Sequence, residues 1–419
     1  MLNRQNGRIA ILAPGAPLPH SLLAHLIVLS LLGVWLALMC VILPSAIAAG
    51  ELAPSIERRI VPRPATGPPA DQPKREESAS AYWDMIAQTQ HKRAAKRRNG
   101  EPVSLEDYVL MQPPPRTRSI IIEQLPEALL TLPGPTEQKY IPVVADFLKS
   151  AQDYFGFVPR RPRSEIDFKR AYAQAAKAAG ITKERAVRIF GFESGGNGTY
   201  DAQAGLEYGS PAAQAISPAI GYNQLLNTNS VELLAEDGEE FVTALRAKAK
   251  NAKADAKRAL EGKIAVLRHM IEFCRSVPDQ WAEHNLLAKT PKGWGVHALN
   301  LDVDIGPLLQ ARKLRTSIEF ARRKGYQGVL TAAELEMMNL TGDGNGFDMV
   351  TMPPALREQV PTANFFEQKG YERNPVAIRN NVVAKLIAAT NAKMDKEVTL
   401  PGARELAAAF DPRPKDVAK

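Results

Sequence analysis

From Ser164 onward the chain repeats apolar residues at helical spacing and rarely alternates apolar with polar residues as strands do. Ser164 can cap a first helix, and Gly180 can end it. The apolar side of this helix carries Phe168, Tyr172, Ala175 and Ala179. Thr182 can cap the next helix, which runs to Glu193. The sequence therefore predicts a mainly α-helical domain over residues 164–410.

Two later segments extend the helical pattern. Residues 239–274 contain no proline and a single glycine, Gly262, and this composition favours long, charged helices. Residues 308–324 are a further predicted helix, whose inward side carries Leu314, Ile318 and Phe320.

The N-terminal segment predicts export. Residues 22–43 are almost wholly apolar and carry no charge, Arg4 and Arg8 precede them, and no acidic residue occurs before Glu51. This charge order is typical of an N-terminus that stays in the cytoplasm while the rest is translocated. The length suffices for a membrane-spanning helix, and the small residues that follow also fit a signal cleavage site. Residues 1–49 are thus expected to be a signal peptide or a transmembrane anchor, with the remainder in the periplasm.

The chain between this segment and the helical domain is rich in proline. Residues 51–163 hold 16 of the 32 prolines, which disfavours an independent fold there. We expect a Pro-rich, basic linker over residues 50–118, interrupted by a helical piece near 80–98 with Trp83 and Ile86 on one side. Residues 119–163 are expected to be an arm that packs on the main domain, and residues 411–419 a loose tail.

Positive charge suits an anionic partner. The net charge is +8, and residues 91–98 form a basic run, His-Lys-Arg-Ala-Ala-Lys-Arg-Arg. The run is interpreted either as a solvated helix face or as a surface attracted to anionic lipid or wall polymer. Because the N-terminal segment predicts export, nucleic acid is not an expected partner.

The sequence offers no metal-binding pattern. Cys40 lies in the apolar segment and Cys274 in a charged one, so a disulfide between them is not expected, and the six histidines lack the close spacing of metal ligands. We therefore expect a function without metal or cofactor.

Glu193 is the candidate catalytic residue. It ends an apolar-periodic helix and is followed by Ser194-Gly195-Gly196, and the run Gly-Tyr-Asn-Gln-Leu-Leu begins at Gly221. A carboxyl group at a break between a helix and a glycine-rich loop can face a cleft while the helix holds it still. Partial desolvation raises the pKa of such a group, so that it can act as an acid near neutral pH. A surface glutamate at a helix C-terminus gives the same local pattern.

The order of these motifs resembles that of the lytic transglycosylases, lysozyme-like enzymes that cut peptidoglycan. The resemblance is carried by Glu193-Ser194, Ser217-x-Ala219-x-Gly221, Gln224-Leu225, Asp304–Leu314 and Met337–Gly342. It covers residues 180–345, with residues 227–303 as a helical insert longer than the family carries. It implies a divergent, lysozyme-like domain of the soluble-lytic-transglycosylase type. The insert is a candidate docking site for another envelope protein.

The resemblance also implies a reaction. Glu193 would protonate the glycosidic oxygen between N-acetylmuramic acid and N-acetylglucosamine. It would then accept the proton of the muramic C6 hydroxyl, which closes a 1,6-anhydro ring. One carboxylate would suffice, where most glycosidases use two.

Further residues follow from the same resemblance. Ser194, Gln224 and Asn339 are implied to position the sugar, since hydroxyl and amide groups match its hydroxyl and N-acetyl groups. Tyr222 and Asn223 replace the usual apolar pair and are further candidate sugar-binding residues. Tyr222 is expected either to stack on a sugar ring or to pack in the core.

Met338 departs from the family pattern, which has a tyrosine beside the glutamate. A methionine would either dry the pocket and raise the pKa of Glu193 further, or weaken the chemistry. Tyr371 or Tyr200 could replace the tyrosine in space.

Three alternatives stay open. A hydrolase would need a second carboxylate, for which Glu207 is the candidate. A non-catalytic wall-binding or scaffold protein would keep the groove without turnover. A basic membrane-surface adaptor would depend on residues 91–98.

Overall fold

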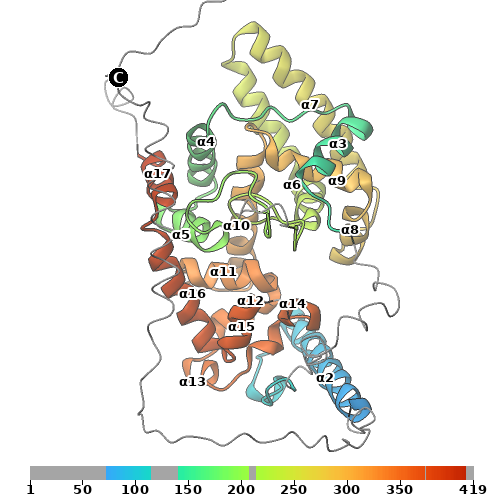
Figure 1. Cartoon of the computed structure of the whole chain (residues 1–419), viewed down its shortest axis with the longest axis vertical. Coiled ribbons are helices and arrows are strands. Elements are labelled where there is room, and N and C mark those ends of the chain that lie inside the picture. Colours follow the sequence, from blue (N-terminus) through green and yellow to red (C-terminus); the bar gives the residue numbers. More distant parts are fainter. Residues whose placement is uncertain (1–71, 115–139, 207–213, 373, 412–419) are drawn as a thin grey trace, which may run out of the picture. The chain divides into compact units, whose positions relative to one another are not determined.

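The computed structural model describes residues 72–114, 140–206, 214–372 and 374–411. The expected signal or anchor segment at 1–49, Glu207 and the tail beyond residue 411 lie outside these ranges. The described residues form helices joined by loops, and their only β-pairings are isolated bridges (Figure 1). The mainly helical class is therefore confirmed. None of the described helices combines the length and apolar character needed to cross a membrane.

The helices of the described chain range from single turns to α2, which has 28 residues. In chain order they are α2 (Gln72–Asn99), η1 (Leu105–Asp107), α3 (Val144–Phe155), α4 (Glu165–Ala178), α5 (Lys183–Ser194), α6 (Asn227–Lys250), α7 (Ala254–Cys274), α8 (Trp281–Ala288), α9 (Pro291–His297), η3 (Ala298–Leu301), α10 (Gly306–Arg323), α11 (Ala332–Thr341), α12 (Asp343–Thr351), α13 (Pro354–Arg357), η4 (Thr362–Phe365), α14 (Gln368–Glu372), α15 (Pro375–Arg379), α16 (Val383–Glu397) and α17 (Pro401–Ala409).

The predicted helices α4 and α5 form where their caps and apolar sides indicate. Thr182 Oγ1 accepts a hydrogen bond from the backbone N–H of Arg185, which satisfies one free donor at the start of α5. Ser164 is the N-cap residue of α4, although its hydroxyl makes no capping hydrogen bond. Phe168 and Tyr172 of α4 are fully buried in the main core.

The helix-favouring segment 239–274 is divided between α6 and α7, which lie side by side (Figure 1). The break falls at residues 251–253, between the end of α6 and the start of α7. A Cβ atom at Gly238 would lie 2.5 Å from the side chain of Ile271, so a glycine is required for this close approach. Cys274, at the end of α7, is buried.

Residues 140–163, the described part of the expected arm, pack on the main core. Helix α3 contacts α9, and the ring of Phe147 lies edge-on to that of His297, with 4.8 Å between their centroids. Gln203 donates a hydrogen bond of 2.9 Å to the carbonyl oxygen of Pro142, and the backbone N–H of Arg160 donates one of 2.7 Å to Asp302. Burial and hydrogen bonds therefore both hold this segment.

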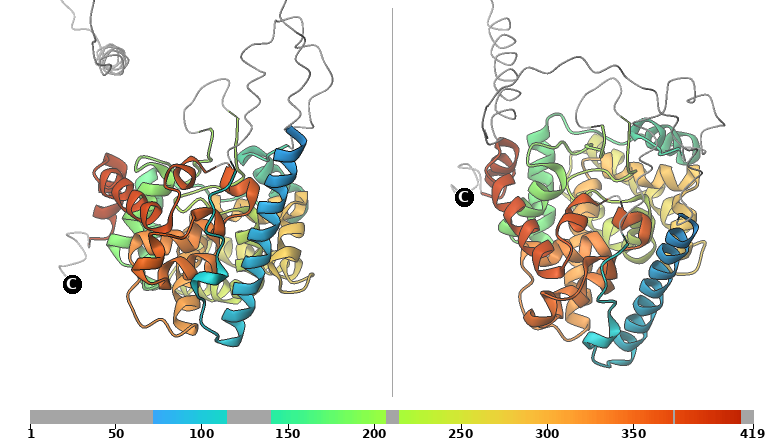
Figure 2. Two further views of the ribbon diagram at one scale, coloured as in Figure 1. Left: turned by 90° about the horizontal axis from the view of Figure 1, so that it is seen from below. Right: turned by 60° about the horizontal axis from the view of Figure 1, so that its bottom comes forward.

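Helix α2 belongs to a second hydrophobic core, which it shares with the C-terminal helices (Figure 2). Ile86 is fully buried there and Trp83 packs against its edge, as their placement on one side of the predicted helix indicated. Tyr108 from the loop after α2 and Phe365 from η4 pack on each other with ring centroids 5.8 Å apart. Met337 of α11 also lies in this core.

Arg93 is a fully buried cation that joins α2 to this core. Its Nε donates a hydrogen bond of 3.2 Å to Asp348, while its Nη1 and Nη2 donate to the carbonyl oxygens of Asp107 (3.0 Å) and Asn364 (2.7 Å). The guanidinium also lies 4.7 Å from the ring centroid of Tyr108, within cation–π range. A buried charge is tolerated only with such partners.

The cations of the basic run 91–98 have a structural role that neither interpretation of the sequence gave them. Arg93 and Arg97 form ion pairs with Asp348, and Lys92 and Lys96 form them with Asp107. Four of the cations in the run thus pair with two buried carboxylates, while the Lys92 side chain stays 55% exposed. The run still holds more cations than it has carboxylate partners, so attraction to anionic lipid or wall polymer stays a prediction.

Replacement of Arg93 is expected to lower the stability of the folded protein more than replacement of the exposed Arg98 on the same helix. The change Arg93→Met should lower the free energy of unfolding by about 3 kcal/mol, because it removes one partner of a buried ion pair. The control Arg98→Met should change it by less than about 0.5 kcal/mol. Urea unfolding followed by circular dichroism measures both. Equal midpoints for the two variants would contradict the anchoring role of Arg93.

Candidate active site

Glu193 lies in the last turn of α5, where the helix is held from one side by the core. Ile189 and Phe190 are fully buried, and Gly195 ends the helix in the left-handed conformation, with φ of 68°. A residue with a side chain adopts that conformation only at a cost, so glycine is suited to end α5 here. The Glu193 side chain itself is half-buried. The expected placement of this carboxyl, at a break between helix and glycine-rich loop, is thus present.

The side chains around Glu193 come from α11 and α16, which both contact α5. Asn339 Nδ2 donates a hydrogen bond of 2.7 Å to Glu193 Oε1. The Glu336 carboxyl lies within hydrogen-bonding reach of the Glu193 carboxyl. Lys393 of α16 donates a hydrogen bond of 2.9 Å to the carbonyl oxygen of Phe192, and its charge acts on both carboxyls. Two acids, one amide and one ammonium group therefore form the cluster.

Burial governs the acidity of this pair. Desolvation raises the pKa of Glu193 above its ordinary value, and the hydrogen bonds from Glu336 and Asn339 and the charge of Lys393 lower it in part. Desolvation and the neighbouring charge of Glu193 raise the pKa of Glu336 well above its ordinary value. A carboxyl with a raised pKa can carry a proton near neutral pH, which general acid catalysis requires.

In helix α11, which carries Met338, the polar side chain beside Glu193 comes from Glu336 and not from position 338. Met338 is fully buried in the main core, and Glu336, two residues earlier, lies beside Glu193. Tyr200 accepts a hydrogen bond of 2.5 Å from Arg161, and Tyr371 packs in the second core against Trp83. No hydrogen bond from either tyrosine to Glu193 occurs among the described residues.

The side chains of Ser194 and Gln224 donate hydrogen bonds to backbone carbonyl oxygens. The Ser194 hydroxyl donates a hydrogen bond of 2.7 Å to the carbonyl oxygen of Phe190, one helical turn earlier. Gln224 has a left-handed backbone, with φ of 43°, and its amide donates to the carbonyl oxygens of Ala202 (3.0 Å) and Gly221 (2.8 Å). Both side chains therefore steady the loops they belong to. Asn339 is the expected positioning residue that contacts Glu193 directly.

Tyr222 and Asn223 are buried and offer no surface to a sugar. The Tyr222 ring has no exposed area and packs among Phe168, Tyr172 and Phe190, while its hydroxyl donates a hydrogen bond to Glu165. Of the two expected roles for this tyrosine, packing is the one observed. Asn223 is equally buried. The interpretation of these two side chains as sugar contacts is corrected, because a groove cannot reach them without opening the core.

A chain of buried polar groups holds the Asn223 loop. Asn223 receives a hydrogen bond from Tyr172 and bonds twice to Gln310, which bonds to Asn300. From Asn300 the chain continues through Ser230 to His297, whose Nε2 meets the carbonyl oxygen of Pro218 at 3.1 Å. A carbonyl oxygen only accepts, so His297 Nε2 carries the hydrogen and Nδ1 accepts from Ser230. The loop is thereby tied to the helical insert.

Gly221 allows this chain to close. Its φ of 85° favours glycine, and a Cβ atom there would lie 2.5 Å from Gln310 Nε2. Packing against Gln310 and the backbone conformation therefore explain why position 221 is a glycine.

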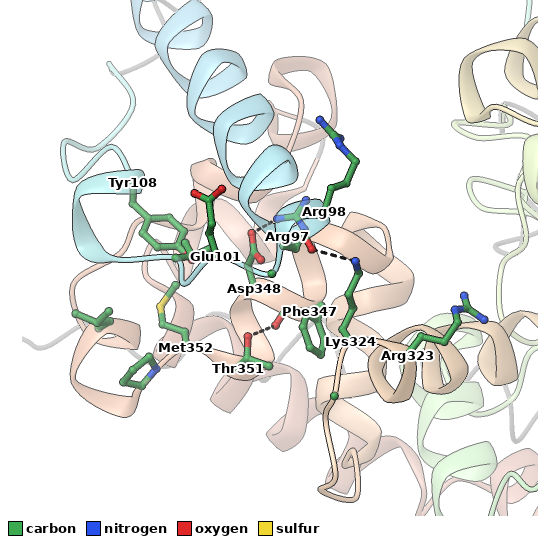
Figure 3. A pocket seen from close by; sticks show the side chains of 15 residues that line it. Arg97, Arg98, Glu101, Tyr108, Arg323, Lys324, Phe347, Asp348, Thr351 and Met352 are labelled. Atoms are coloured by element: carbon green, nitrogen blue, oxygen red, sulfur yellow. Dashed lines mark hydrogen bonds and ion pairs between the residues drawn. The ribbon is translucent and has the colours of Figure 1, made fainter.

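Two cavities lie among the described residues, and Glu193 lines neither. One of about 710 Å³ lies where the ends of α2 and α10 meet α12, and Figure 3 shows the Arg97–Asp348 pair in it. Arg98 and Arg323 point away from that pair, in different directions (Figure 3). The other, of about 480 Å³, lies between the Gly156–Arg160 segment and the α6–α7 pair. Neither cavity contains the expected site residues.

Glu336 is the site residue that the motifs did not reveal. It precedes Asn339 by three positions, so both lie on one side of α11. The sequence signal that could have revealed Glu336 is an acidic residue flanked by apolar ones, three positions before Asn339. Only the packing of α11 on α5 shows what it faces.

The chain matches no protein-family model, no curated protein and no solved structure.

The buried His297 is expected to make stability depend on acidity. Burial lowers the pKa of His297 to about 3, whereas an unfolded histidine titrates near about 6.5. Between these pH values His297 is protonated in the unfolded chain and neutral in the folded chain, so the free energy of unfolding falls as the pH falls.

Comparison of His297→Gln with the wild type isolates this contribution. Between about pH 6 and about pH 4 the wild type should lose up to about 1.4 kcal/mol more per pH unit than the variant, measured by urea unfolding. The control His269→Gln, at an exposed position of α7, should keep the wild-type slope. The same slope in all three proteins would show that His297 is not buried in neutral form.

Proposed function

We propose that this protein cleaves peptidoglycan glycan strands between N-acetylmuramic acid and N-acetylglucosamine and leaves 1,6-anhydromuramic ends. The observation that carries the proposal is the Glu193 carboxyl, which is fixed at the end of α5, half-buried and bonded to Asn339. Burial raises its pKa, which favours the protonated form that an acid catalyst needs. The order of the sequence motifs around it supports the same assignment.

The proposed reaction uses one carboxyl group twice. Protonated Glu193 gives its proton to the glycosidic oxygen, the bond from that oxygen to C1 breaks, and positive charge develops at C1. The Glu193 carboxylate then takes the proton of the C6 hydroxyl as that oxygen bonds to C1. The proton lost in the first step is regained in the second, so neither water nor a cofactor is consumed.

A lysozyme-like arrangement of residues 164–410 and action in the periplasm belong to the same proposal. The helical composition of the described residues supports the first. The second is supported by the sequence pattern of residues 22–43 and the positive charges before them.

A second candidate is a non-catalytic peptidoglycan-binding or scaffold protein. It is favoured by the burial of Tyr222 and Asn223 and by the inward bonding of Ser194 and Gln224, which leave few polar side chains to line a sugar groove. Such a protein would bind wall polymer without altering it.

Replacement of Glu193 separates the two candidates. Purified sacculi are incubated with the wild type, Glu193→Gln and the control Glu184→Gln, whose carboxylate is exposed in the first turn of the same helix. Mass spectrometry of the released fragments should show anhydro ends for the wild type and the control, and a loss of ~10³-fold for Glu193→Gln. Reducing ends would indicate hydrolysis instead.

The same sacculi serve to measure binding. If wild type and Glu193→Gln sediment equally with sacculi and neither releases fragments, the enzyme proposal fails and the scaffold candidate stands.

A further inference from the structure

Glu336 presents a buried carboxyl that lacks an ordinary partner. Its side chain has no exposed area, and neither of its oxygens accepts a hydrogen bond of good geometry within the described residues. Its close neighbours are the Glu193 carboxyl and the amide of Asn339, which donates to Glu193. A buried, ionised carboxylate without donors is strongly disfavoured.

Two carboxyl groups can form a hydrogen bond with each other only if one of them is protonated. Ionised carboxylates are acceptors alone, so two of them repel, whereas a protonated carboxyl donates to its neighbour. One proton therefore resolves both problems at this site: it removes a buried charge and creates a hydrogen bond.

The surroundings decide which of the two acids holds that proton. Glu336 is enclosed by the core, whereas Glu193 is half-buried and accepts the hydrogen bond from Asn339. Lys393, which is exposed on α16, is the charged group beyond the pair that acts on it. Negative charge is thus better tolerated on Glu193. When the pair holds a single proton, that proton belongs on Glu336, and Glu193 takes up the second proton that it later gives to the sugar.

We propose that Glu336 is a permanently neutral carboxylic acid that donates a hydrogen bond to Glu193 and so positions and stabilises its carboxylate. Its catalytic part rests on the function proposed above. When Glu193 has given its proton to the glycosidic oxygen, the new carboxylate accepts from Glu336 and from Asn339. When Glu193 regains a proton from the C6 hydroxyl, Glu336 still holds its own. Glu336 is accordingly a positioning residue that exchanges no proton with the sugar.

Carbon-13 NMR of the full chain labelled at the glutamate carboxyl carbon tests the protonation state without any activity. At about pH 8, where an ordinary glutamate is ionised, one carboxyl signal of the protonated form is expected to persist. This condition also lies above the pKa of about 7 to which burial raises Glu232. The signal should vanish in Glu336→Gln and remain in Glu193→Gln. Its absence from the wild type, or its loss in Glu193→Gln alone, would overturn the inference.

The pH profile of sacculus cleavage tests the positioning role. Glutamine keeps a neutral donor at position 336, so Glu336→Gln should leave the alkaline limb of kcat/KM where the wild type has it. Glu336→Leu removes the donor, so its alkaline limb should move to higher pH and kcat should fall by roughly tenfold or more. Circular dichroism confirms that each variant is folded. A limb that moves to lower pH in Glu336→Gln would mean that Glu336 is ionised in the wild type, which contradicts the proposal.

The two proposals fail in different ways. A protonated Glu336 in a protein that never cleaves sacculi would refute the enzyme and leave the neutral carboxyl in place. Cleavage that depends on Glu193, by a protein with no protonated carboxyl at about pH 8, would refute the neutral carboxyl alone.

Discussion

Polar side chains that leave water on folding must find a partner or lose their charge, and this requirement shapes each part of the molecule. The Arg93 guanidinium in the second core bonds to Asp348 and to two carbonyl oxygens, and a ring lies over its face. Those contacts add to the burial of Ile86, which also holds α2 on the second core. The charges in its last turns are consequently part of the structure, because four of them pair with the buried carboxylates of Asp107 and Asp348.

The same requirement produces the polar chain from Asn223 to His297. Each member donates to or accepts from the next, so an apolar replacement at any point would strand a buried neighbour. This chain explains why a loop with a sugar-binding pattern is so firmly held. At Glu193 and Glu336 no second donor is at hand, and a proton takes the place of a partner. A site that contains a proton-holding pair is chemically different from one that contains a single acid.

The candidate site was only partly predictable. The position of Glu193 followed from a local pattern, since an apolar stripe, a helix end and a glycine are all readable within a few residues. Asn339 followed from motif order as a sugar-positioning residue, and the structure adds its hydrogen bond to Glu193. The burial of Tyr222 and the role of Glu336 did not follow, because an exposed and a buried position of the same residue type look alike in sequence. Which side chain of α11 faces α5 depends on how these helices, which lie far apart in the chain, pack on each other.

By itself the sequence determined the helical class, the extents of α4 and α5, the helical character of residues 239–274 and the position of one carboxyl at a helix end, because these depend on spacing and caps within single segments. Only the tertiary structure decided that cations of the basic run would pair with two buried carboxylates and that Glu193 would meet a second acid. Both outcomes depend on contacts across 140 or more residues, such as Arg93 with Asp348 and Glu193 with Glu336. Local periodicity carries no information about partners so distant, because desolvation and charge pairing act only once the chain has folded.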